Sequence, residues 1–384
     1  MRRTHTRIHR IAPSLILLAT LTATCASAQE SPEGISYAAR TYLEQALDLM
    51  QQNALNKSSI DWPNLRTETL ARASHAKTTV DTYPAITFAL TQLKEHHSFL
   101  QLPDNLPAPQ REAITAEINK VRAPSDSDAN QSPFAPQKEM QGHLDRRGGK
   151  IFAHVVVPMC VAKYAEWEKN AGDFQEFAEK LHSIVMDLQA QKPDGWLIDL
   201  RGNRGGNMWP MLAGIGAVLG EGDLGTFESA DGERVPWFYK AGKAGTRDSK
   251  GQVEIAAHVE KPLFALPELP WVAVLLDRST GSSGEAVAIS FTGRPRARSF
   301  GEHTAGFSTS NQRYPLSDGA ALFLCVGIEA DRTGHRYPDG LDPDVQLPAP
   351  DSRPTEEKDA VLQTAEDWIA GQASAPSSRT PHLM

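Results

Sequence analysis

The sequence predicts an α/β protein with a mostly parallel sheet, preceded by a small helical subdomain. Between residues 150 and 291, short continuous runs of Val, Ile and Leu alternate with longer segments of helical periodicity. Strands that are apolar on both faces and are joined by helices are typical of a parallel sheet covered on both sides. Residues 30–105 instead carry apolar residues at three- to four-residue spacing, which predicts helices.

The first 28 residues predict a secretory signal peptide. Four arginines precede an uncharged apolar run, and the segment closes on Ala26-Ser27-Ala28. We therefore expect residues 1–28 to be removed and, in a bacterium, a periplasmic or secreted protein. A lipid anchor at Cys25 is the less favoured alternative, because Thr24 fits that pattern poorly. No later stretch is apolar enough to predict a membrane span.

Charge and cysteine content narrow the classes of partner. The formal net charge is -8 at pH 7, and loss of four arginines with the signal peptide gives -8 - 4 = -12. An acidic surface argues against nucleic acid or anionic lipid as a partner. After the signal peptide only Cys160 and Cys325 remain, either as a disulfide or as two buried thiols. Neither belongs to a Cys/His cluster, so we expect no metal and no cofactor.

The chain after the signal peptide divides into four parts by composition. These are a helical subdomain (29–121), a flexible loop or linker (122–149), an α/β core (150–372) and a disordered tail (373–384). The loop is predicted because it is rich in Pro, Ser, Asp, Gln and Gly and has no apolar periodicity.

Within the core, buried strands are expected to alternate with helices. The expected strands are 150–158, 195–201 and 271–277, and the expected helices are 174–191, 208–220, 284–291 and 356–371. A β-rich excursion is expected between Gly222 and Pro270, and a hairpin is expected to turn at Ser317-Asp318-Gly319.

Two strand-to-helix turns carry the residue types of a hydrolytic site. In DLRGNRGGN (199–207), glycines permit close backbone approach and leave N–H groups free for an oxyanion, although alone this pattern favours a simple tight turn. In TGSSGEA (280–286), Ser282 and Ser283 begin a helix, where serine is more often an N-cap. Together in one sheet, the two turns favour an acyl-transfer site.

A nucleophilic serine needs a proton acceptor near pH 7, and histidine or lysine is the usual one. The segment LKEHHSFL places His96 and His97 just past an amphipathic helix, where an imidazole can project from a loop.

Four segments, in this order, resemble the C-terminal-processing or tail-specific serine peptidases, which include the tricorn protease core and interphotoreceptor retinoid-binding protein. They are LKEHHSFLQLP, GWLIDLRGNRGG, TGSSGEAVA with the following GEHTAG, and YPDGLDPDVQLP. The resemblance covers most of residues 80–347, and the joint occurrence is more specific than any single motif. It implies a ClpP/crotonase-like β-β-α core.

The resemblance also implies roles for residues of both turns. Ser282 lies three residues before Glu285, as the family's nucleophile does. Ser283 would supply one oxyanion N–H, and Gly205 or Gly206 the second.

The implied base is a histidine. Members that use a Ser/Lys pair carry the lysine in FGKG, and Phe307 stands at that position here, which excludes a lysine there. The branch resembling the tricorn core uses a histidine of the N-terminal segment, which His97 matches. The group that orients the imidazole is left open between Tyr337, which aligns with that branch's glutamate, and Asp339.

Other residues near the motifs are expected to have structural roles. We expect Asp199 and Arg201 to form an internal ion pair and Glu285 to cap the helix that starts near Ser282. Two tryptophans near the motifs, Trp196 and Trp209, are expected in the core. Two histidines, His96 and His303, are expected at the surface.

Many members of the family carry a PDZ domain of about 90 residues before the catalytic core, which binds substrate C-termini by strand addition. Only the 122–149 loop stands there in this chain. We therefore expect a secreted or periplasmic serine endopeptidase that acts through an acyl-enzyme and recognises polypeptide or peptide substrates through its own cleft or through the 122–149 loop. The alternatives are a binding protein that kept the fold without catalysis, and an esterase for a small acyl substrate.

Overall fold

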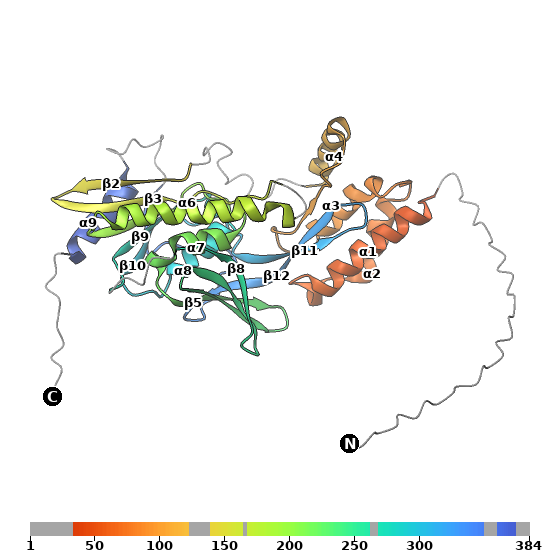
Figure 1. Ribbon diagram of the computed structural model, residues 1–384. Helices are drawn as coiled ribbons and strands as arrows, with labels where there is room; N and C mark the ends of the chain where they lie inside the picture. The colour runs from red at the N-terminus through yellow and green to blue at the C-terminus, as the bar shows by residue number, and fades with distance from the viewer. Residues whose placement is uncertain (1–33, 123–138, 164–166, 262–267, 349–358, 374–384) are drawn as a thin grey trace, which may run out of the picture.

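The computed structural model describes residues 34–122, 139–163, 167–261, 268–348 and 359–373 (Figure 1). The expected signal peptide, residues 123–138 of the expected loop and residues 374–384 of the expected tail lie outside the described residues. Among the helices of the described ranges, none has both the length and the apolar character that a membrane crossing requires.

Four α-helices form the N-terminal region and lie together at one end of the molecule in Figure 1. They are α1 (Tyr37–Asn53), α2 (Trp62–Arg72), α3 (Tyr83–Thr91) and α4 (Ala108–Val121), with 3₁₀ turns at Lys57–Ser59 and Val80–Thr82. The Ser36 side chain accepts a hydrogen bond from the Ala39 N–H and caps α1, and Asp61 caps α2 in the same way. Apolar side chains at helical spacing then build a common core, which includes Leu43 and Leu47 of α1.

A six-stranded sheet forms the centre of the α/β core, in the order β13-β10-β9-β4-β3-β2. The strands are β2 (Gln141–Arg147), β3 (Lys150–Val156), β4 (Gly195–Asp199), β9 (Val272–Leu276), β10 (Ala297–Gly301) and β13 (Val345–Gln346). All neighbours are parallel except β2 with β3. The expected parallel sheet is thus confirmed.

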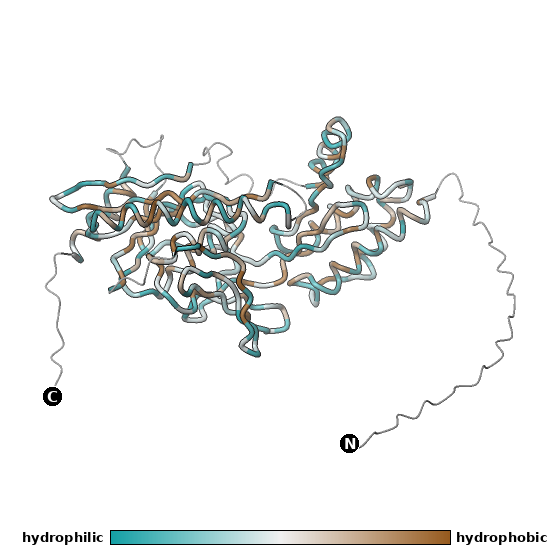
Figure 2. The backbone as a smooth tube through the Cα atoms, viewed as in Figure 1, coloured by the Kyte–Doolittle hydropathy of each residue, from teal (hydrophilic) through white to brown (hydrophobic). Residues whose placement is uncertain are grey.

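Helices cover both faces of this sheet. Alternate residues of the strands, such as Trp196 and Ile198, pack with α6 (Ala171–Gln189), α7 (Met208–Leu219) and α8 (Ser283–Phe291). The residues between them pack with α9 (Ala360–Ala373). Figure 2 shows apolar residues recurring along α6 and the strands beside it. This arrangement explains the continuous apolar runs in the sequence.

The loop expected through residue 149 is wrong at its C-terminal end, because Gln141–Arg147 form strand β2. Gly148 and Gly149 turn the chain with φ values of 58° and 77°, and β2 then pairs with β3. Because most residues of β2 are polar, the sequence shows no apolar pattern that would predict this strand. It lies at the edge of the sheet, where His143 and Asp145 have polar neighbours and only a few positions pack against the core.

A second, antiparallel sheet of seven strands has the order β1-β12-β5-β6-β7-β8, with β11 also paired to β12. Its strands are β1 (Phe99–Gln101), β5 (Gly222–Ser229), β6 (Arg234–Lys240), β7 (Lys243–Arg247), β8 (Val253–His258), β11 (Thr309–Pro315) and β12 (Ala321–Asp331). The expected β-rich excursion supplies β5 to β8, and the expected hairpin supplies β11 and β12. Strand β1, directly after the histidine pair, was not expected.

The tip of the β11–β12 hairpin docks into the helical core. Its turn contains Gly319 at a φ of 91°, and Leu316 and Leu322 pack with the helices. The Tyr42 hydroxyl donates a 2.7 Å hydrogen bond to Asp318 Oδ1, and the Tyr83 hydroxyl donates one of 2.7 Å to Asp318 Oδ2. Burial opposes ionisation of Asp318, but these bonds outweigh it and lower the pKa of the carboxyl. Asp318 therefore anchors the hairpin to the helices.

Replacing Asp318 with Ala should lower the free energy of unfolding by about 2–4 kcal/mol, because two largely buried tyrosine hydroxyls lose their acceptor. Urea denaturation would measure the loss. The matched control is Asp231→Ala, which removes an exposed carboxylate that pairs with Lys57 and should cost less than about 1 kcal/mol. Equal losses in the two variants would contradict the anchoring role.

Candidate active site

Ser282 occupies a strained turn between strand β9 and helix α8. Its φ of 52° and ψ of -123° lie where residues other than glycine are rarely found. The Ser282 N–H donates a 2.8 Å hydrogen bond to Glu285 Oε2, which holds this conformation. The Ser282 side chain lines a large cavity. A serine on a sharp strand-to-helix turn with its hydroxyl exposed has the geometry of a nucleophile elbow.

The Glu285 carboxylate receives four hydrogen bonds. Besides the Ser282 N–H, the donors are the Thr304 hydroxyl at 2.5 Å, the Gly306 N–H at 2.9 Å and the Phe307 N–H at 2.8 Å. Full burial raises the pKa of Glu285 to about 7, and the hydrogen bonds act in the opposite direction. The expected capping contact is confirmed, and the same carboxylate also fixes the 304–307 turn beside the serine.

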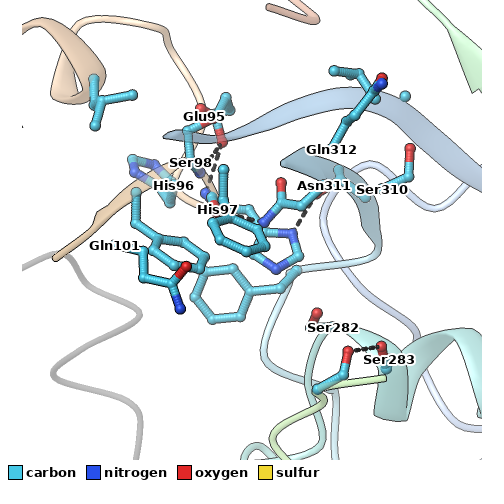
Figure 3. A pocket seen from close by; sticks show the side chains of 18 of the residues that line it. Glu95, His96, His97, Ser98, Gln101, Ser282, Ser283, Ser310, Asn311 and Gln312 are labelled. Atoms are coloured by element: carbon cyan, nitrogen blue, oxygen red, sulfur yellow. Dashed lines mark hydrogen bonds between the residues drawn. The ribbon is translucent and has the colours of Figure 1, made fainter. Parts of the chain in front are cut away.

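His97 faces the same cavity from the segment between α3 and β1 (Figure 3). Its Nδ1 lies 2.8 Å from the Thr309 hydroxyl, and its ring packs against Phe307 with centroids 5.3 Å apart. Its backbone N–H donates to the Glu95 carboxylate at 2.7 Å. Burial lowers the pKa of His97 to about 4, against the opposing effect of a hydrogen bond with the Thr309 backbone. The imidazole is therefore neutral at pH 7, as a general base must be.

Ser282 and His97 lie across the cavity from each other without a direct hydrogen bond in the described structure. Since Nδ1 is engaged by Thr309, Nε2 is the nitrogen left for a proton from serine. Catalytic hydrogen bonds are often long in the absence of substrate and shorten in the complex.

The two residues considered for orienting His97 are placed elsewhere. The Tyr337 hydroxyl donates to Asp331 Oδ2 at 2.8 Å, and Asp339 is exposed, with its carbonyl 2.9 Å from His303 Nε2. The 337–341 segment contacts the site through backbone groups, for example the Tyr337 carbonyl, which accepts from the Ser308 hydroxyl. Thr309, which the sequence analysis missed, holds the imidazole instead.

Of the two candidate oxyanion glycines, Gly206 has the better geometry. The Gly205 N–H already donates to Asn203 Oδ1 at 2.9 Å. Within the described residues, no hydrogen bond occupies the N–H of Gly206 or of Ser283, and both residues line the cavity. A Cβ on Gly206 would lie 2.0 Å from the Cys160 carbonyl oxygen, so glycine is required there. The Ser283 hydroxyl donates to the Gly206 carbonyl at 2.7 Å and holds the two turns together.

Of the other expectations around the 199–207 turn, the ion pair and the core position of Trp196 are confirmed, and the core position of Trp209 is not. Asp199 and Arg201 form the expected ion pair at 2.8 Å, and Arg201 also pairs with Asp359 at 2.6 Å. Trp196 lies in the core as expected, but Trp209 lines the cavity, because it packs only partly against the core. His96 and His303 are exposed, as expected. Cys160 and Cys325 are free and buried, which agrees with the alternative of two buried thiols.

Residues 162–347 match the model of peptidase family S41. The chain carries a peptidase S41 domain. Proteins of this family are serine peptidases, so the domain is that of a hydrolase.

The similarity to two relatives and to one solved structure extends beyond residues 162–347. The chain is 25% identical to the nisin-resistance protein of Lactococcus lactis subsp. lactis over 306 residues, which are 79% of this chain and 82% of that protein. It is 27% identical over 262 residues to the carboxyl-terminal-processing protease of Synechocystis sp., covering 65% of this chain and 52% of the relative. A lipoprotein structure from Streptococcus agalactiae, 21% identical, superposes with a TM-score of 0.60 over 88% of this chain and 98% of that one, which shows a shared fold.

The S41 domain and the helical region enclose the cavity together. Its volume is about 1450 Å³, and its walls come from α3 and α4, the segment around His97, the two turns, and strands of the antiparallel sheet. Glu329 of β12 is fully buried at this wall, and within the described residues its Oε2 has no hydrogen-bond partner. Burial, assisted by the Glu285 charge, raises the pKa of Glu329 well above its usual value. The signal for it in the sequence was an acid that directly follows the apolar run of β12.

We expect the Thr309→Val variant to lower kcat by about 10- to 100-fold with little change in KM, because the imidazole loses the partner of Nδ1. Thr309→Ser, which keeps the hydroxyl, should retain most of the activity. Steady-state kinetics on a cleaved peptide would measure both. If Val and Ser lower kcat equally, the hydroxyl does not position His97.

The His97 imidazole should stay neutral well below the pH at which an unperturbed histidine titrates, with a pKa of about 4, because burial disfavours the charged ring. Its side-chain ¹⁵N resonances, assigned by comparison with His97→Gln, would report the titration. A midpoint near 6.5 would show that the ring is solvated and not buried.

Proposed function

We propose that this S41 protein is a secreted or periplasmic serine endopeptidase in which Ser282 is the nucleophile and His97 the general base. One observation carries the proposal. A serine held by Glu285 on a strained turn and an imidazole fixed through Nδ1 by Thr309 line a single cavity.

In this mechanism the Ser282 hydroxyl attacks the carbonyl carbon of a bound peptide while His97 Nε2 accepts its proton. The oxyanion is stabilised by the N–H groups of Ser283 and Gly206, which have no other acceptor in the described residues. Protonated His97 then gives its proton to the leaving amine, and the acyl-enzyme remains on Ser282. A water molecule, deprotonated by His97, hydrolyses the ester and restores the serine.

The lowered pKa of His97 affects both the uptake and the release of the proton in this cycle. A neutral imidazole is available as a base at every pH above about 5, because burial holds its pKa near 4. The imidazolium formed during attack is poorly solvated at this position. It therefore transfers its proton readily to the leaving group.

The cavity supports a polypeptide segment as the substrate. Its volume of about 1450 Å³ exceeds the 300–1,000 Å³ typical of small-molecule sites. Aromatic side chains contribute to its walls, among them Phe88, Trp209, Phe227 and Phe323. We infer a preference for substrates with apolar side chains. The names of the two relatives, for nisin resistance and carboxyl-terminal processing, are compatible with a peptide substrate.

Substrate selection is assigned to this cavity because the sequence has no room for a PDZ domain at the usual place. Helix α4 ends at Val121 and strand β2 begins at Gln141. The interval is far shorter than the roughly 90 residues of a PDZ domain. The binding-protein alternative is supported by the lack of a direct hydrogen bond between Ser282 and His97. We favour a peptidase because both side chains and the two N–H groups proposed for the oxyanion line one cavity.

Ser282→Ala and His97→Ala should each lower kcat/KM by at least about 10³-fold while the fold is kept. The neighbouring residues provide matched controls. Ser283→Ala keeps its backbone N–H but removes the hydrogen bond to the Gly206 carbonyl, so it should lose clearly less activity than Ser282→Ala. His96→Ala, on an exposed side chain, should lose less than about 10-fold. Cleavage of a diverse peptide mixture, followed by mass spectrometry, would measure all four, with circular dichroism as the test of folding.

Other outcomes would redirect the assignment. If Ser283→Ala abolished cleavage and Ser282→Ala did not, the nucleophile would be Ser283. Turnover of small esters alone, lost in Ser282→Ala, would indicate an esterase. A folded protein that binds peptides and cleaves none would be a binding protein.

A further inference from the structure

We propose that His143, Asp145 and His154 form a site for a divalent transition metal ion, with Zn²⁺ as the best-fitting ion. None of the three lines the catalytic cavity, so the site is separate from the peptidase centre. No metal was expected from the sequence because neither Cys160 nor Cys325 belongs to a Cys/His cluster, and this ligand set contains no cysteine.

The β2–β3 hairpin brings the three side chains to one face of the sheet. His143 and His154 are directly opposite each other in the antiparallel register, and Asp145 lies two residues after His143 on the same face. His143 Nε2 is 3.1 Å from Asp145 Oδ1, and His154 Nδ1 is 2.9 Å from Asp145 Oδ2. All three ligand atoms lie within 4.8 Å of one another.

The two nitrogen-to-oxygen separations, which involve different oxygens of Asp145, are slightly shorter than the spacing of ligands around a tetrahedral zinc ion. With Zn–N and Zn–O bonds of about 2.0–2.1 Å, neighbouring tetrahedral ligand atoms are about 3.3 Å apart. Two imidazoles and one carboxylate are a ligand set that zinc commonly takes, with a fourth position left for water.

One nitrogen of the cluster lacks an ordinary partner. His143 Nε2 is buried, and among the described residues no group makes a hydrogen bond of normal geometry with it, although Asp145 is close. A buried imidazole nitrogen without a hydrogen bond is costly. A metal ion between this nitrogen, Asp145 and His154 would satisfy it.

A carboxylate lies behind one of the imidazole ligands. His154 is buried, and while its Nδ1 faces Asp145, its Nε2 lies 3.4 Å from Asp199 Oδ2. Zinc-bound histidines usually direct their second nitrogen to a carboxylate in this way, which fixes the ring and strengthens the ligand. Glu366 of α9 adds a further buried acid that interacts electrostatically with Asp145 and His154.

The local charge also favours a dication. The acids around the cluster are Asp145, Asp199, Asp359, Glu366 and Asp367, and the described guanidinium groups paired with them are Arg147 and Arg201. The excess of carboxylates leaves negative charge for a cation to neutralise. The competing arrangement has no metal, with a protonated His154 bridging Asp145 and Asp199.

The test is isothermal titration of Zn²⁺ into the chain without a histidine tag, in the Ser282→Ala background. We expect saturable binding of one equivalent, with micromolar or tighter affinity, weakened at least tenfold by His143→Ala and by Asp145→Asn. His143 is half-buried on an edge strand, so this variant should fold, and circular dichroism would verify it. His258→Ala, which removes an exposed histidine beside Glu260, is the matched control and should bind as tightly as the parent.

Co²⁺ provides a second readout, since the visible absorption of a four-coordinate cobalt ion should appear in the parent and be lost in His143→Ala. Absence of saturable Zn²⁺ binding would overturn the proposal in favour of the protonated bridge. Binding equally weakened by His258→Ala, or unchanged by His143→Ala, would also overturn it. Because the nucleophile is absent throughout, these results do not depend on the peptidase assignment.

Discussion

The buried carboxylate of Glu285 is the interaction on which the geometry of the site depends. Its oxygens hold the backbone of Ser282, the hydroxyl of Thr304 and the amides of Gly306 and Phe307. Four donors on one buried acid can offset the cost of desolvating it only if each keeps its position. The same constraint fixes the strained serine and the Phe307 backbone beside the imidazole, so the proposed nucleophile and one contact of the proposed base both depend on this carboxylate.

The base reaches this centre through a different part of the chain. His97 lies between α3 and β1, and β1 pairs with β12. The carbonyl of His97 accepts a hydrogen bond from Asn311, and the hydroxyl of Ser98 accepts one from the Cys325 amide. The Asp318 anchor joins the same hairpin to the helical core. The β11–β12 hairpin thus contacts both the helical region and the segment that carries His97, and it positions the two relative to the sheet.

The sequence was sufficient for the elements whose residues are buried on both sides and for the strand-to-helix turn at Ser282. Trp196 and the runs around it indicate a covered parallel strand, and the spacing of Ser282 and Glu285 reflects one turn of helix. Thr309 could not be identified, because its side-chain direction depends on β11–β12 register, which shifts between Ser310 and Asn311. Likewise, the approach of His143 to His154 follows from a hairpin whose first strand is too polar to recognise.

The two proposed catalytic side chains lie next to helices that belong to separate hydrophobic cores. Ser282 begins a helix of the core that includes Trp196, whereas His97 follows a helix whose core includes Leu43. Neither core contains both reacting groups, and only the completed cavity brings them face to face. A chain in which only one of the two cores has folded would therefore hold the serine and the histidine apart. Under the proposed mechanism such a chain cleaves no peptide bond, and activity begins only when both cores are complete.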